Sequence, residues 1–244
     1  ITIAIIDSGV NIQHPELSAN IWTNPGEVND SFDNDSNNLL NDLHGWNFIA
    51  NSNDISDELG HGTQAAGIIA ARENSNGLIG IASKAKIMPL KVLNSQGNGS
   101  TSNVIKAINY AVNKGAKVIN MSFGGAGADT QALRSACNNA VANGVVLVAA
   151  AGNSNSDIDS KHFAPAMFES VIAVGSITST GTKASFSNTG NALDLVAPGV
   201  HLLTTRSGTN NENTNQVLND SSDRYIISSG TSFSSPIVAA AVAL

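Results

Sequence analysis

Apolar strands and amphipathic helices alternate through the middle of this chain of 244 residues. Apolar runs at 87–93, 118–121 and 145–150 each predict a strand with both faces buried. The two segments between them carry apolar residues at helical spacing and end at Gly115 and Gly144. Consecutive strand–helix–strand units build a parallel sheet with helices on both faces. The sequence therefore predicts a three-layer α/β fold with a mainly parallel sheet.

Further elements extend this arrangement on both sides. The run at 1–6 predicts another strand, and 171–174 and 193–196 add two candidates. Small and apolar residues at 64–71 and 237–244 predict helices that pack closely on the sheet. Ser102 is predicted to cap the helix that ends at Gly115. The polar, Asn-rich segment 210–224 is predicted to be an exposed loop.

Length and composition indicate one globular domain over residues 1–244. Hydrophobic residues make up 41% of the chain and charged residues 13%, unlike a disordered or coiled-coil protein. A formal charge of −7 argues against a nucleic-acid partner, and no apolar run is long enough to span a membrane. The single cysteine, Cys137, excludes an intrachain disulfide. We expect the domain to be truncated at both ends, since the chain begins in a strand and stops in a helix.

A polar stretch rich in Asn and Asp, residues 20–57, is too long for an ordinary connection. Within it, oxygen-bearing side chains alternate along the chain, and a carbonyl and a further carboxylate follow. This pattern suits Ca²⁺, which takes six to eight oxygen ligands in irregular geometry. The candidate ligands are Asp33, Asp35, Asn37, Leu39 and Asp42. A solvated loop is the alternative, because the Gly and terminal Glu of an EF-hand loop are missing.

Four polar motifs stand at the ends of predicted strands or at the starts of predicted helices. They are Asp7-Ser8-Gly9, His61-Gly62-Thr63, Ala151-Gly152-Asn153 and Gly230-Thr231-Ser232. Each has an ordinary structural explanation when taken alone, such as a turn aspartate or a helix-capping serine. The carboxyl ends of parallel strands, however, share the edge at which α/β sheets bind ligands. These residues are therefore candidates for a common site.

The four motifs, in this order, resemble those of the subtilisin-like serine proteases, and the likeness covers nearly the whole chain. The resemblance implies that Ser232 is a nucleophile and that His61 takes its proton. Asp7 would fix the tautomer of the imidazole, while Asn153 and the Ser232 backbone N–H would bind the oxyanion. The implied activity is hydrolysis of polypeptides by a serine endopeptidase through an acyl-enzyme.

Two alternatives belong to other functional classes. One is a catalytically silent member of the family that only binds peptides, which we expect to show a substitution at Asp7, His61, Asn153 or Ser232. The other is a doubly wound nucleotide-binding domain. It is disfavoured because neither G-x-G-x-x-G nor G-x-x-x-x-G-K-[ST] opens any predicted helix.

The resemblance also implies where a substrate lies. The segments Gly97-Asn98-Gly99 and Ser122-Phe123-Gly124 resemble the edges between which family members hold an extended peptide, although plain loop turns would also explain the glycines. The pocket for the side chain before the scissile bond would have Ser122 to Gly124 and Ala150 to Gly152 as walls. Counting back from Val171 places its floor at Phe163, or at His162 if the loop is shifted by one residue. A bulky floor predicts a preference for small or medium apolar side chains.

A second calcium site is implied by the resemblance alone. Its ligands would be the side chains of Glu16 and Asn74 and the carbonyls of Arg72, Asn76 and Leu78. Glu16 stands where the family more often has Asp. The resemblance further implies a structural calcium, no catalytic cofactor, a propeptide in the full precursor, a monomer and an extracellular, secreted protein.

Overall fold

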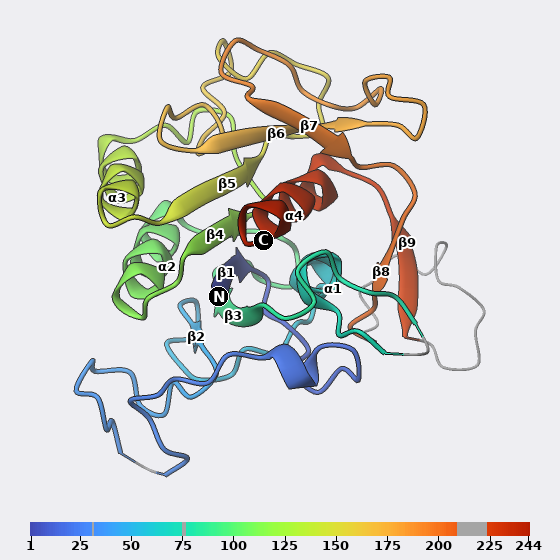
Figure 1. Ribbon diagram of the computed structural model, residues 1–244. Coiled ribbons are helices and arrows are strands. Elements are labelled where there is room, and N and C mark those ends of the chain that lie inside the picture. The colour runs from blue at the N-terminus through green and yellow to red at the C-terminus, as the bar shows by residue number, and fades with distance from the viewer. Residues whose placement is uncertain (31, 75–76, 209–223) are drawn as a thin grey trace.

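A parallel β-sheet forms the centre of the structure. The structure is a computed structural model, and it describes residues 1–30, 32–74, 77–208 and 224–244. Among these residues, seven strands lie in the order β2-β3-β1-β4-β5-β6-β7, and each neighbouring pair is parallel (Figure 1). In chain order they are β1 (Thr2–Asp7), β2 (Trp46–Asn47), β3 (Lys86–Lys91), β4 (Val118–Met121), β5 (Val146–Ala150), β6 (Ile172–Ile177) and β7 (Leu195–Pro198). The predicted parallel sheet is confirmed.

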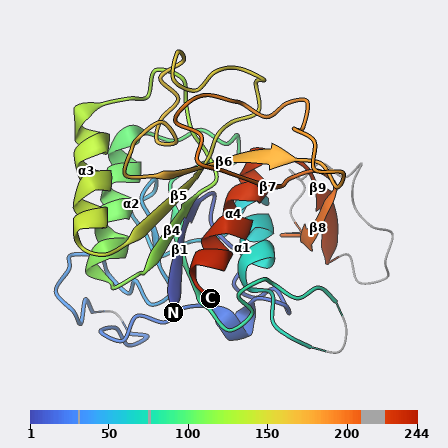
Figure 2. The same ribbon diagram turned by 45° about the horizontal axis from the view of Figure 1, so that its top comes forward.

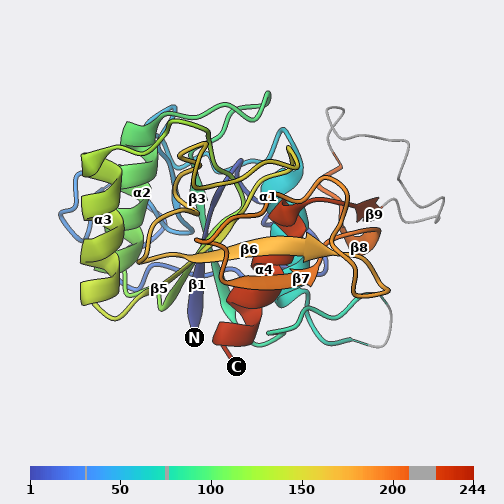
Figure 3. The same ribbon diagram turned by 90° about the horizontal axis from the view of Figure 1, so that it is seen from above.

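Helices cover both faces of this sheet and complete three layers. On one side lie α2 (Thr101–Asn113) and α3 (Gln131–Ala142), and on the other α1 (His61–Ala70) and α4 (Thr231–Val242) (Figure 3). Side chains alternate between the faces of a strand, so Ile6 of β1 joins the core beneath α2 and α3 while Ile5 joins the core beneath α1 and α4. This two-sided burial explains why the central strands are apolar throughout.

Smaller elements lie outside the main sheet. A short 3₁₀ helix, η1, spans Ser18–Asn20, and β8 (Leu202–Thr205) pairs with β9 (Tyr225–Ser228) as an antiparallel ladder. No pattern in the sequence predicted β8 or β9. Of the predicted loop at 210–224, all but Arg224 lies outside the described residues. In the described ranges, no helix has the length and apolar character needed to cross a membrane.

Ser100, rather than the predicted Ser102, caps α2. The backbone of Ser100 is extended, with φ −105° and ψ 144°, and its side chain accepts a hydrogen bond from the N–H of Asn103 at 3.2 Å. Ser102 already lies inside the helix, and its hydroxyl lies 3.0 Å from that of Ser100. A Ser-Thr-Ser run offers several capping hydroxyls, and the local backbone decides which one is used.

The packing of α1 against α4 brings two helix starts to the carboxyl edge of the sheet. The two helices lie beside each other on the same face (Figure 2). Their first residues, His61 and Thr231, therefore approach the ends of β1, β4 and β5, which also end at this edge. The fold thus collects residues from distant parts of the chain into one place.

Candidate active site

An acid and an imidazole meet where β1 ends and α1 begins. Asp7 is fully buried, and its Oδ1 lies 2.8 Å from Nδ1 of His61, whose side chain is 23% exposed. The N–H of Ser8 also donates to this Oδ1, at 2.7 Å. The approach of α1 requires a glycine next to the histidine, because a Cβ on Gly62 would lie 2.1 Å from the carbonyl oxygen of Gly9. The strand end and the helix start therefore hold the pair in contact.

The surroundings of His61 favour its protonated form. Burial of the ring acts to lower the pKa of His61. The charge of Asp7 and its hydrogen bond, together with the charge of Asp57, outweigh this effect and raise the pKa above its ordinary value of 6.5. An imidazole in this setting accepts a proton readily, as a general base must.

Ser232, the second residue of α4, lies in a cavity that His61 also lines. Its hydroxyl donates to the carbonyl oxygen of Ser122 at 2.8 Å, and the hydroxyl of Ser122 donates to the carbonyl oxygen of Ser232 at 2.7 Å. This reciprocal pair fixes the start of α4 to the end of β4. In this conformation the Ser232 hydroxyl donates to Ser122, so it has to exchange this acceptor for His61 before it can react.

Asn153 follows β5 and is anchored by the first residue of α4. Its Oδ1 accepts hydrogen bonds from the N–H of Thr231 at 2.8 Å and from the Thr231 hydroxyl at 2.9 Å. Because the oxygen of the amide is bound in this way, Nδ2 remains available as a donor. The N–H of Ser232 is among the helix-start amides that have no intrahelical acceptor. These two donors border the same cavity.

The cavity has a volume of about 340 Å³ and contains most of the predicted substrate residues. Its lining includes Gly97, Ser122, Phe123, Gly124, Ala150, Gly152, Asn153, Phe163 and Ser232. A neighbouring cavity of about 250 Å³ is lined by Asn98 and Gly99 together with apolar side chains such as Leu93, Val104 and Leu133. The two predicted edges thus border both cavities.

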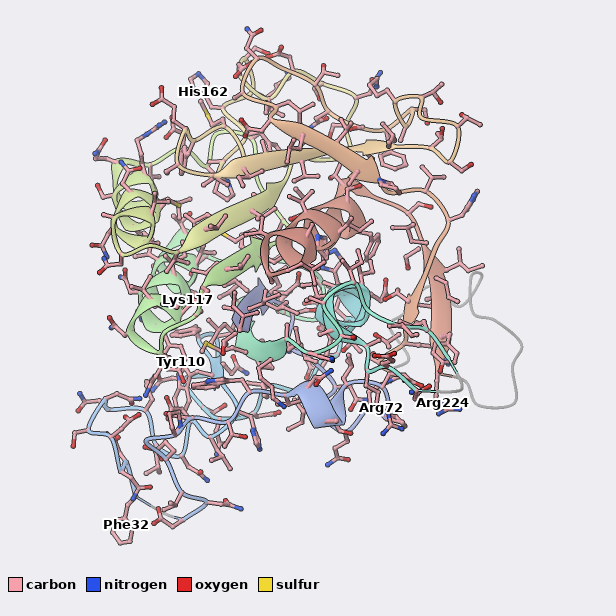
Figure 4. The ribbon with its side chains drawn as sticks, in the orientation of Figure 1. Phe32, Arg72, Tyr110, Lys117, His162 and Arg224 are labelled. Carbon is pink, nitrogen blue, oxygen red and sulfur yellow. The ribbon has the colours of Figure 1, made fainter. Side chains whose placement is uncertain are left out.

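The ring of Phe163 lies between the two predicted walls. A Cβ added to Gly124 would come 2.4 Å from Cε1 of this ring, and a Cβ added to Gly152 would come 2.7 Å from Cζ. The ring therefore packs against each wall at a glycine, where a larger residue would collide with it. His162, the alternative for the floor, is 63% exposed and lies at the edge of the molecule (Figure 4). Of the two candidates, Phe163 lines this cavity and His162 does not.

Comparisons with known proteins identify the family of this chain. A family model described as the Subtilase family matches residues 1–244. This chain belongs to the subtilase family. It is 38% identical to a thermophilic serine proteinase of Bacillus sp. (strain AK1), over 99% of this chain and 51% of that protein. It is 36% identical to subtilisin DY of Bacillus licheniformis, over 100% of this chain and 76% of that protein.

Solved structures confirm the subtilase fold. A crystal structure of a cold adapted subtilisin-like serine proteinase matches with a TM-score of 0.78 and 32% identity, over 99% of this chain and 73% of the other. The chain spans about half the length, 51%, of the thermophilic proteinase. Family membership sets aside the nucleotide-binding alternative. A silent subtilase would be expected to lack one of the four candidate residues, and Asp7, His61, Asn153 and Ser232 are all present.

The loop predicted to bind calcium holds a cluster of carboxylates in this subtilase. Oxygens of Glu27, Asp35 and Asp42 lie within 4.8 Å of one another. Glu27 was not predicted, because no motif links it to the alternating residues. Asp33 lies outside this cluster and accepts hydrogen bonds from the backbone of Asn37 and Asn38. Asn37 donates to Asp42 at 2.8 Å, and Leu39 donates its N–H to Asn37 at 2.6 Å.

Side chains of α2 complete the surroundings of this cluster. The hydroxyl of Tyr110, which Figure 4 shows where α2 meets the loop, donates to Asp42 at 2.6 Å. Burial, together with this hydrogen bond, raises the pKa of Tyr110 well above its ordinary value, so it remains a donor. The ammonium of Lys114 pairs with Asp35 and lies 3.5 Å from Asp42. Burial acts to raise the pKa of Asp35, but hydrogen bonds from Lys114 and Asn24 lower it overall.

The second predicted calcium site is assembled around Glu16, which is 1% exposed. Its two carboxylate oxygens accept hydrogen bonds from Tyr225 at 2.7 Å and from Nδ2 of Asn74 at 2.5 Å. Tyr225 was not predicted, because it arrives from β9, more than two hundred residues along the chain. Arg72 donates its N–H to the carbonyl oxygen of Glu16 at 2.9 Å. Asn76 lies outside the described residues. Within the described residues, no hydrogen bond of the Leu78 carbonyl tests its predicted role.

Proposed function

We propose that this chain is the catalytic domain of a serine endopeptidase with Ser232 as nucleophile, His61 as general base and Asp7 as the residue that orients the base. The observation that carries the proposal is the 2.8 Å contact between Asp7 and His61 beside a cavity that Ser232 and Asn153 also line. Sequence similarity to proteins named serine proteinases and subtilisins supports it.

The reaction begins when the Ser232 hydroxyl turns from Ser122 toward Nε2 of His61. His61 takes the proton as Oγ attacks the peptide carbonyl, and Nδ1 keeps its hydrogen bond to Asp7. Collapse of the tetrahedral intermediate breaks the C–N bond, and His61 returns the proton to the leaving amine. A water molecule, deprotonated by the same imidazole, then hydrolyses the acyl-enzyme and releases Ser232.

The oxyanion of each tetrahedral intermediate would bind to Nδ2 of Asn153 and to the N–H of Ser232. The anchoring of Asn153 Oδ1 by Thr231 supports this role, since it fixes the amide before charge develops. The N–H of Ser232 lies at the positive end of the α4 helix dipole, which favours an anion.

We propose that the substrate is an extended polypeptide held between the segments 97–99 and 122–124. The ring of Phe163 fills the space between Gly124 and Gly152, so the side chain before the scissile bond has to be small or medium in size and apolar. The neighbouring apolar cavity of about 250 Å³ would hold a side chain further toward the amino end of the substrate.

A structural Ca²⁺ fits the cluster of Glu27, Asp35 and Asp42. Glu27 Oε2 and Asp35 Oδ1 are buried and have no hydrogen-bond partner among the described residues. Three carboxylates against the single ammonium of Lys114 leave an excess of two negative charges, which one divalent cation would balance. When bound, the ion would stabilise the fold through oxygen ligands and take no part in peptide hydrolysis.

The fit at Glu16 is weaker, because protein donors already satisfy both of its carboxylate oxygens. A cation there would require the amide of Asn74 to present its oxygen instead of its nitrogen, and such amide orientations are assigned from the hydrogen-bond network. Calcium at this place stays a prediction, as do the secreted location, the propeptide and the monomeric state.

Hydrolysis of a casein-derived peptide, followed by mass spectrometry of the acid-quenched enzyme, tests the proposed function. We expect cleavage and an acyl adduct on Ser232 in the wild-type protein, and neither in Ser232→Ala. A folded wild-type protein that binds the peptide without cleaving it would favour the silent peptide-binding module instead.

A further inference from the structure

Asp57 is a buried carboxylate just before α1 that the mechanism above does not use. It is 3% exposed and accepts five hydrogen bonds. Oδ1 accepts from the Ser8 hydroxyl at 2.8 Å, the Gly60 N–H at 2.8 Å and the Leu59 N–H at 3.3 Å, and Oδ2 accepts from the N–H and hydroxyl of Thr63 at 2.8 and 2.6 Å. A carboxylate with this many donors is held in one orientation.

We propose that Asp57 is a positioning residue that ties the end of β1 to the start of α1, and so holds Asp7 and His61 in their reactive geometry. The inference rests on the proposed function, since it concerns the same catalytic pair. Among the described residues, Asp57 hydrogen-bonds to neither member of the pair and acts through the residues that adjoin them.

Ser8 connects Asp57 to the acid. The N–H of Ser8 donates to Oδ1 of Asp7 at 2.7 Å, while its hydroxyl donates to Asp57 and accepts from the N–H of Gly62 at 3.0 Å. Gly62 is the residue that follows His61. The Ser8 side chain therefore joins two groups, Asp57 and the N–H of Gly62, while the Ser8 backbone holds Asp7.

Asp57 also substitutes for the missing cap of α1. The residue at the cap position is Gly60, which has φ +89° and offers no side-chain hydrogen bond to the helix. The carboxylate of Asp57 takes the N–H groups of Gly60 and Thr63 instead, and its charge lies at the positive end of the helix dipole. His61 is the first residue of this helix, so the same contacts fix the place from which its ring projects.

The pKa of His61 depends on the charged groups around its ring, and Asp57 is one of them. Asp7 faces the ring from β1, and the apolar ring of Phe233 in α4 lies 5.6 Å away. Lys91 of β3 is 5% exposed, binds the carbonyl oxygens of Ser8 and Ser56, and lies 3.8 Å from Glu58. Asp57 adds a negative charge that raises the pKa of His61, so its loss should lower that pKa.

The substitution Asp57→Asn tests the inference in the full protein, with kcat, KM and the pH profile measured on a peptide anilide. The amide cannot accept at both positions, so it breaks the link to Thr63 or the link to Ser8. We expect kcat to fall ~10- to 100-fold while KM changes little, as for small misplacements of reacting groups. The midpoint of the acidic limb of kcat/KM should move to lower pH. Asp54→Asn is the matched control and should change none of these values, since Asp54 is exposed and, among the described residues, its carboxylate hydrogen-bonds only to Ser56.

Ser8→Ala separates the hydrogen-bond link from the charge effect, because it removes the Ser8 hydroxyl and leaves the carboxylate of Asp57 in place. It should lower kcat without moving the acidic limb, and it also serves if Asp57→Asn does not fold. Rates are expressed per active site labelled by a serine-directed phosphonofluoridate. An unchanged kcat in Ser8→Ala, or a kcat loss in Asp57→Asn without a shift of the acidic limb, would overturn the inference. A wild-type protein that takes no label would refute the proposed function itself.

Discussion

Phe163 offers the sharpest test of how the substrate pocket is built. Its ring lies where side chains on Gly124 and Gly152 would lie, 2.4 and 2.7 Å from positions that a Cβ would occupy. The substitution Phe163→Ala removes the ring atoms that lie close to Gly124 and Gly152. Alanine, unlike glycine, adds no conformational freedom to the backbone. The vacated space lies between the two walls, and we expect it to accept a large apolar side chain of the substrate.

The size of the effect follows from the apolar surface that the substrate would bury. Full burial of a leucine or phenylalanine side chain contributes about 1.5–3 kcal/mol. Because about 1.4 kcal/mol corresponds to a factor of ten, the preference for Phe over Ala before the scissile bond should rise about 10- to 150-fold in Phe163→Ala. The wild-type protein should favour the smaller side chain.

The assay compares kcat/KM for peptide anilides that differ only in the residue before the scissile bond, with Ala, Leu, Phe and Arg in turn. His162→Ala is the control, since its exposed neighbouring side chain should leave the preference unchanged. A wild-type preference for Arg or for large aromatic residues would refute the reasoning, as would a ratio of Phe to Ala that Phe163→Ala leaves unaltered.

Three further predictions concern the base, the oxyanion site and the carboxylate cluster. Activity requires neutral His61, whose pKa is raised above 6.5. We therefore expect kcat/KM to fall as the pH drops, with a midpoint above pH 6.5. A midpoint well below pH 6.5 would contradict this assignment of the base. Asn153→Ala should lower kcat about 10²- to 10³-fold with little change in KM, since this is the loss of kcat found when such a donor is removed from a subtilisin. A loss of kcat below about fivefold would argue against a role of Asn153 in binding the oxyanion. Chelation of Ca²⁺ should lower the melting temperature of the wild-type protein and have less effect on Asp42→Asn, whereas a melting temperature that ignores the chelator would argue against a bound ion.

The central sheet could be predicted from the sequence because its strands are buried on both faces. The runs that became β1, β4 and β5 are apolar almost without interruption, and only a covered parallel sheet accommodates such strands. Strands β8 and β9 were missed because four-residue segments such as Leu202–Thr205 carry polar residues and show no clear period. Their pairing depends on contacts between residues far apart in the chain.

The candidate catalytic residues could also be selected from the sequence, since each stands at a strand end or a helix start and belongs to a recognisable motif. The hydrogen bonds that connect these residues could not be predicted from the sequence. The reciprocal hydrogen bonds of Ser122 and Ser232 and the five acceptor contacts of Asp57 arise from the way β1, β4, α1 and α4 pack. Glu27 joined the carboxylate cluster for the same reason, because chain folding and not local spacing brings it to Asp35.

One measurement tests the central claim most directly, which is that Ser232 is activated by His61. The protein is treated with a serine-directed phosphonofluoridate, digested, and the modified peptide is mapped by mass spectrometry. We predict one adduct on Ser232 that forms rapidly in the wild-type protein and is lost in a folded His61→Ala variant. Labelling of a different serine, or labelling of Ser232 at the same rate without His61, would contradict the account.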